Sequence, residues 1–142
     1  MSMTKEQIRK NAVRHLWICA LSVAALHIAL IVVCKCFEIK EISIYAKASS
    51  WAVAFSFVEL FVVVHLWKWI ASSHLDYLSI YHTAVSGFRM LLVLIILGIM
   101  TMVIGRDNIA PYAIAFLAYY TVLLILHSVF FAKMTNKLFT KQ

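Results

Sequence analysis

Four long apolar stretches constrain this chain more than any other feature of its sequence. They cover residues 16–33, 51–70, 86–104 and 110–131, about 18 to 22 residues each. As helices they would be about 27–33 Å long, which matches a bilayer hydrocarbon core of about 30 Å. Because lipid offers no partner to a free backbone amide, stretches this long and continuous are expected to be helical. The sequence therefore predicts an all-α membrane protein, a compact bundle of four transmembrane helices, with residues 1–142 as one domain.

Composition excludes two other classes of protein. The chain is 64% hydrophobic and 13% charged, whereas soluble domains are about 45–50% apolar and about 25% charged. A soluble domain of this size could not bury so much apolar surface, and disorder requires low hydrophobicity. The net charge is +7, but the basic residues cluster at the ends of the apolar stretches, where they orient a membrane protein and contact headgroups. The bilayer, and not nucleic acid, is the expected partner.

The distribution of lysine and arginine predicts the orientation. Nine of the 13 basic residues fall on the side of the two termini and of segment 71–85, and four fall on the other side. Because basic residues are retained in the cytoplasm, we expect both termini there, in the cell inner (plasma) membrane. Cys34 and Cys36 then face the opposite side. The first stretch has no cleavage site after it and is expected to be a retained anchor, and the links 34–50 and 71–85 could carry short interfacial helices.

The sequence offers little support for catalysis or for a resident metal. The three cysteines are Cys19, Cys34 and Cys36, and one intervening residue between the last two is too few for a structural zinc pair. No nucleophile–base pair, phosphate-binding loop or cluster of metal ligands is recognisable in the sequence. We expect a protein that is not an enzyme and that needs no cofactor or metal.

Glu59 lies near the middle of the second stretch. An ionisable residue at that depth costs at least about 2.5–3.5 kcal/mol and is a functional candidate for that reason. On its own helix face only Ser56 could hydrogen-bond to it, and His65 lies six positions further along, on another face. We expect Glu59 to face protein, neutral or paired, and to pack, handle ions or protons, or contact a partner. A Glu59→Gln replacement is expected to leave folding nearly intact.

Four further polar residues lie within or at the edge of the stretches. His27 and His127 could in principle ligate a haem, but their depths differ by roughly 10 Å at 1.5 Å per residue, which favours interhelical hydrogen bonds. Tyr120 shares a helix face with His127. Arg89 is expected to be an anchor that reaches the headgroups, or a fixed cation that pairs with a carboxylate of a partner protein.

Two segments resemble a known family. Ser86-Gly87-Phe88-Arg89-Met90-Leu91-Leu92, a short turn, and then Ala115-Phe116-Leu117-Ala118-Tyr119-Tyr120 are similar to the closing hairpin of the ATP synthase protein I family. Four spans, cytoplasmic termini and a basic N-terminus are similar too. The resemblance implies a non-enzymatic role beside the rotary ATP synthase, in which the protein helps the c subunits assemble into a ring. It also carries a disputed suggestion of divalent-ion transport.

Two other classes of function are compatible with the same residues. One is a small polytopic carrier, flippase or ion transporter, which would oligomerise to form a pathway that includes Glu59. The other is the membrane-anchor subunit of a redox complex, which would copurify with a haem absorbance.

Overall fold

The computed structural model describes residues 4–38, 40 and 42–139. Its elements are α1 (Lys5–Cys36), α2 (Ile42–Ser73), the short 3-10 helix η1 (Leu75–Tyr77), α3 (Leu78–Ile104), the 3-10 helix η2 (Arg106–Asn108) and α4 (Ile109–Phe139). None of the described residues forms a strand. Four helices are long and apolar enough to cross a membrane, and each of them contains one of the predicted stretches. The all-helical prediction is confirmed, and four helices have the length and apolar character that the predicted spans require.

The helices extend well beyond the apolar stretches. The predicted links 34–50 and 71–85 are largely helical, because α2 already begins at Ile42 and only four residues separate its end at Ser73 from the start of α3 at Leu78. Hydropathy identifies only the part of a helix that suits lipid. The hydrogen bonds of the helix backbone can continue beyond it into polar surroundings, so the helix is longer than its apolar stretch. At the N-terminal end of α1, Thr4 and Gln7 form a capping box with hydrogen bonds of 3.2 and 3.3 Å. This capping box stabilises a helix that begins before the apolar stretch.

The turn between α3 and α4 agrees with the sequence prediction. Gly105 ends α3 with φ 90° and ψ 157°, a conformation that side-chain-bearing residues avoid, and its N–H donates to the carbonyl of Thr101 at 3.1 Å. Pro111 lies in the first turn of α4, where a missing N–H removes no helical hydrogen bond. These two residues reverse the chain sharply.

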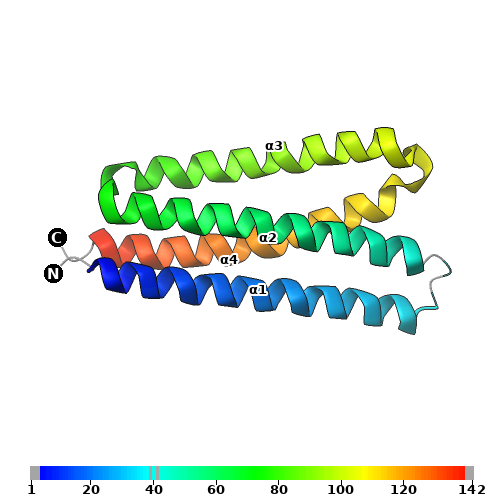
Figure 1. Ribbon diagram of the computed structural model, residues 1–142, viewed down its shortest axis with the longest axis horizontal. Coiled ribbons are helices and arrows are strands. Elements are labelled where there is room, and N and C mark those ends of the chain that lie inside the picture. The colour runs from blue at the N-terminus through cyan, green and yellow to red at the C-terminus, as the bar shows by residue number, and fades with distance from the viewer. Residues whose placement is uncertain (1–3, 39, 41, 140–142) are drawn as a thin grey trace.

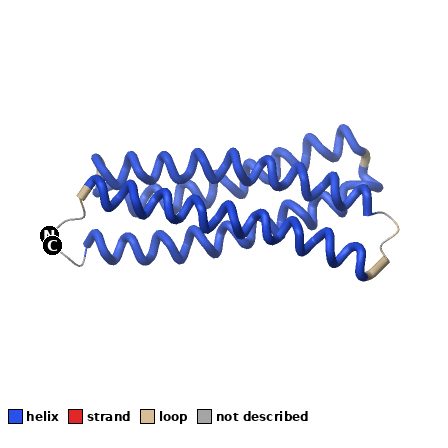
Figure 2. Tube along the Cα trace, turned by 60° about the horizontal axis from the view of Figure 1, so that its bottom comes forward, coloured by secondary structure: helices blue, strands red, loops and turns tan. Residues whose placement is uncertain are grey.

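The four helices run up and down along one axis (Figure 1). One end of the bundle contains the N-terminal end of α1, the C-terminal end of α4 and the η1 connection, and we name it the terminal end. The opposite end contains η2, and we name it the loop end. The tube in Figure 2 shows the same arrangement from another side. This placement puts the beginning of α1 and the end of α4 at the same end of the bundle.

The core lies mainly between α1, α2 and α4. The α1–α2 interface is the most extensive, and the α2–α4 interface is next. Small side chains allow the close approach of α2, since Ala48 and Ala52 are fully buried, and Trp67 and Tyr119 are among the largest side chains in the core. In the most apolar 18-residue segments of α1 and of α3 only 11% of the residues are buried, against 39% in the corresponding segment of α2. The outer helices α1 and α3 therefore present most of their apolar surface to the outside of the bundle.

Candidate functional site: a polar cluster inside the helix bundle

A buried ion pair joins α2 to α3. Nε of Arg89 contacts Oε1 of Glu59, and the two side chains are only 3% and 7% exposed. Glu59 therefore faces protein, as expected, and it is paired. Arg89 is buried and is already paired with a carboxylate of its own chain, whereas the sequence predicted an anchor that reaches the headgroups or a cation paired with a carboxylate of a partner protein.

Arg89 has further capacity to donate. Its Nη2 atom is buried and has no hydrogen-bond partner among the described residues. Its guanidinium carbon lies 5.9 Å from the centroid of the Tyr120 ring, within range of a cation–π contact. Because a guanidinium has five N–H donors and no acceptor, one ion pair leaves it able to bind a second acceptor.

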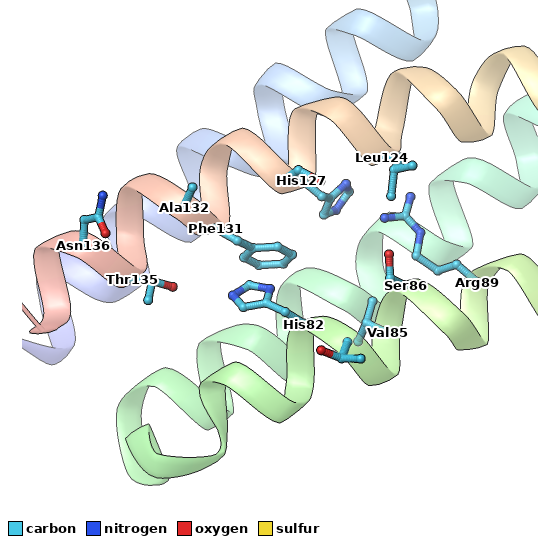
Figure 3. Close-up of a pocket in the computed structure, with 12 residues that line it drawn as sticks. His82, Val85, Ser86, Arg89, Leu124, His127, Phe131, Ala132, Thr135 and Asn136 are labelled. Atoms are coloured by element: carbon cyan, nitrogen blue, oxygen red, sulfur yellow. The ribbon is translucent and has the colours of Figure 1, made fainter.

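A pocket of about 530 Å³ lies between α3 and α4 beside this guanidinium. Figure 3 shows Arg89 and His127 at its inner end, with His82 and Phe131 facing each other in the middle. The rings of His82 and Phe131 have centroids 4.0 Å apart. Ser86 of α3 adds a hydroxyl to the same wall. The pocket is thus rich in hydrogen-bonding groups although it lies between two helices that are apolar enough to cross a membrane.

His127 is held in a defined orientation. Its Nδ1 lies 2.7 Å from the carbonyl oxygen of Leu123, one turn earlier in α4. A carbonyl can only accept, so Nδ1 carries the proton and Nε2 has a free lone pair. Nε2 is buried and has no hydrogen-bond partner among the described residues. This imidazole therefore has a fixed tautomer and an unused acceptor.

Two residues that sequence reasoning missed lie next to His127. The ring of His15 in α1 stands edge-on to it, with centroids 4.9 Å apart and an interplanar angle of 89°. Cys19 Sγ lies 3.5 Å from Nε2 of His15. Sequence reasoning found no cluster of metal ligands, but the fold brings this one together. The available signal was the spacing of four between His15 and Cys19, which places both on one helix face.

The remaining predicted site residues lie elsewhere. His27 Nδ1 is 2.6 Å from Ser49 Oγ, which is in turn 2.7 Å from the hydroxyl of Tyr119. This chain of hydrogen bonds joins α1, α2 and α4, so His27 has the interhelical bond expected of it and does not face His127. His65 is exposed and bonds only locally, at 2.8 Å, to the carbonyl oxygen of Phe61. Glu59, Arg89, Tyr120 and His127 thus form one cluster, and His27 and His65, the other two candidates for contact with ions or a partner, lie outside it.

Comparisons of the chain with known protein families, with curated proteins and with solved structures find no match. The resemblance to the ATP synthase protein I family therefore rests on the two segments of α3 and α4 that carry it. Both segments contribute to the cluster, since Ser86 and Arg89 belong to the first and Tyr120 to the second.

Proposed function

We propose that this protein is a non-enzymatic accessory protein of the cell inner membrane that binds another membrane protein, like the c-ring assembly factors of F-type ATP synthases. The observation that carries the proposal is the free Nη2 of Arg89 beside the pocket between α3 and α4. A buried donor without a partner costs about 1–3 kcal/mol. An acidic or carbonyl group from a partner helix would remove that cost, so the pocket favours complex formation.

The surface of the bundle supports the same function. The exposed apolar faces of α1 and α3 can contact helices as readily as lipid. A second pocket, of about 640 Å³, lies between α2, α3 and α4 towards the loop end, and Trp51, Ile99 and Phe116 are among its mostly apolar lining residues. Helix association in membranes depends on close packing and on interhelical hydrogen bonds. This protein offers a partner helix an apolar surface for close packing and a buried hydrogen-bond donor.

The test is the yield of assembled c-rings. The chain is co-expressed with the c subunit of the same organism, and rings are separated from free subunits on native gels. Ser86→Leu places an apolar side chain in the pocket and is expected to lower the yield severalfold. Gly87→Leu is the matched control, because a side chain at this neighbouring position meets open space. Equal yields from both variants and from the unmodified protein would contradict the proposal.

A small carrier or ion transporter that oligomerises is the second candidate. The observation that favours it is the Glu59–Arg89 pair next to a polar pocket inside the bundle, since charged groups in membrane helices commonly line transport paths. A normal ring yield in a deletion strain, together with a defect in lipid-linked sugar or ion flux, would favour this candidate. A haem absorbance that copurifies with the protein would instead favour the redox anchor.

The proposed topology has both termini and the α2–α3 connection in the cytoplasm. Cys36 is exposed, and Cys34 is buried. A membrane-impermeant thiol reagent should therefore label Cys36 in cells whose envelope has been made permeable as far as the inner membrane, while the inner membrane itself stays intact. A cysteine placed at Gln142 should stay unlabelled until the cells are lysed. The opposite pattern would reverse the orientation.

A further inference from the structure

The cluster of His15, Cys19 and His127 has the composition of a metal site. All three residues are buried, at 4%, 0% and 2% exposure. One ligand atom of each lies within 4.8 Å of those of the other two. Two imidazoles and a thiolate are ligands that soft and borderline transition metals prefer, unlike the oxygen ligands of Mg²⁺ and Ca²⁺.

The distances are close to those that coordination requires. A metal bonded to nitrogen at about 2.0 Å and to sulfur at about 2.3 Å with trigonal angles separates these two atoms by about 3.7 Å. Cys19 Sγ is 3.5 and 3.7 Å from the two nitrogens of His15. His127 needs to approach by about 1 Å to complete the same spacing.

The free nitrogen of His127 is the observation that indicates a ligand. A hydrogen bond between His15 and Cys19 accounts for those two residues without a metal, but Nε2 of His127 stays buried and meets no partner in the part of the chain that the structure describes. The bond from Nδ1 to the Leu123 carbonyl is the kind of outer contact that orients metal-binding histidines and leaves the other nitrogen free to coordinate. A bound ion would occupy that nitrogen.

The total charge of the three ligands favours a monovalent ion over a divalent one. A thiolate and two neutral imidazoles bring one negative charge, so Cu⁺ gives a neutral site and Zn²⁺ leaves a net positive charge. Arg89 interacts electrostatically with all three residues, and its own charge is already balanced by Glu59. An extra buried positive charge beside this pair would be costly. We propose that His15, Cys19 and His127 bind one Cu(I) ion, with release of the Cys19 thiol proton to solvent.

Two pockets border the proposed site. His127 lines the pocket between α3 and α4 in Figure 3. His15 lines a separate pocket of about 430 Å³, whose other lining residues include Asn11 and Lys133 near the terminal end. The proposed site lies between these two pockets and ties α1 to α4, a pair of helices that makes fewer contacts than α1 with α2.

The test is Cu(I) binding by the purified full-length protein in detergent under anaerobic, reducing conditions. A chromogenic Cu(I) chelator competes with the protein, and Zn(II) is titrated separately. We expect one equivalent of Cu(I) per chain and at least about 100-fold weaker binding by Cys19→Ser and His127→Leu, because even outer-shell losses cost 10–100-fold. The controls are the double variant Cys34→Ser/Cys36→Ser, which removes the other two thiols, and His65→Leu, which removes an exposed imidazole; both should bind as the unmodified protein does.

X-ray absorption on the unmodified protein tests the same assignment without relying on a variant that folds. One sulfur and two nitrogen ligands around copper are expected. Two sulfur ligands, or loss of binding in the Cys34→Ser/Cys36→Ser variant, would move the site to those thiols and overturn the proposal. Failure to bind Cu(I), or tighter binding of Zn(II) than of Cu(I), would overturn it as well.

Discussion

Breaking the Glu59–Arg89 pair should destabilise the bundle far more than breaking a surface ion pair. Exposed pairs contribute about 0–1 kcal/mol, whereas removal of one partner from a buried pair costs about 3–5 kcal/mol. Side-chain exposures of 3% and 7% place this pair in the second class. The sequence alone suggested that Glu59→Gln would be nearly neutral, but an arginine partner changes that expectation, because glutamine leaves a buried guanidinium charge uncompensated.

The two single variants should differ in a defined direction. Glu59 can take up a proton when its partner is removed, whereas Arg89 stays charged at every accessible pH. We therefore expect Glu59→Leu to cost about 3–5 kcal/mol and Arg89→Leu about 1–3 kcal/mol, the latter being the cost of a buried neutral polar group. The double variant should lie within about 1 kcal/mol of the unmodified protein, since apolar replacement of a buried pair is often neutral or stabilising.

The assay is reversible unfolding in mixed micelles of dodecyl maltoside and sodium dodecyl sulfate, followed by tryptophan fluorescence, to which the buried Trp67 and three exposed tryptophans contribute. The four proteins form a double-mutant cycle, which isolates the interaction between the two side chains. A coupling free energy of about 3 kcal/mol or more is expected, about a 100-fold change in the unfolding equilibrium. Coupling below about 1 kcal/mol, or an Arg89→Leu variant less stable than Glu59→Leu, would refute the reasoning.

The same unfolding assay tests two hydrogen bonds and one turn. Ser49→Ala breaks the hydrogen-bond chain that joins α1, α2 and α4 and should cost about 1–3 kcal/mol, while Ser50→Ala, its exposed neighbour, should stay within about 0.5 kcal/mol. Tyr81→Phe removes the 2.5 Å bond to the Val63 carbonyl and should cost about 1 kcal/mol, whereas the exposed Tyr77→Phe should be neutral; equal effects would contradict the role of this bond. Gly105→Ala should cost about 1–3 kcal/mol because of its φ of 90°, and a stabilising effect would contradict the strained turn.

Apolar length and charge were sufficient to predict the helices. The lipid-crossing segments have to be helical whatever their neighbours are, so this part of the fold depends on local sequence only. The Gly105 turn and the position of Pro111 were predictable for the same reason. The ends of α1 and α2 were not, because a helix that leaves the bilayer continues until a cap or a break ends it, and hydropathy carries no information on that.

The polar cluster could be predicted only in part. The cost of a buried carboxylate marked Glu59 as a residue that needs a partner, but not which helix would supply it. Arg89 was misjudged because its nearness to the start of an apolar stretch suggested a boundary position, whereas α3 begins at Leu78, 11 residues earlier. His15 was overlooked for a similar reason, since α1 begins at Lys5 and carries it into the bundle. Pairing across helices depends on their rotation and register, which a single sequence does not give.

Two polar contacts join α3 to α2 in one half of the helix. In lipid the helices gain little from hiding apolar surface from one another, so packing and interhelical hydrogen bonds decide their arrangement. α3 buries little of its apolar surface and is joined to α2 through Arg89 and Tyr81, both in the half nearer the terminal end. Towards the loop end its neighbours leave the apolar pocket of about 640 Å³. The helix is therefore fixed where its polar side chains meet partners, and it is open to lipid or to another helix where it has none.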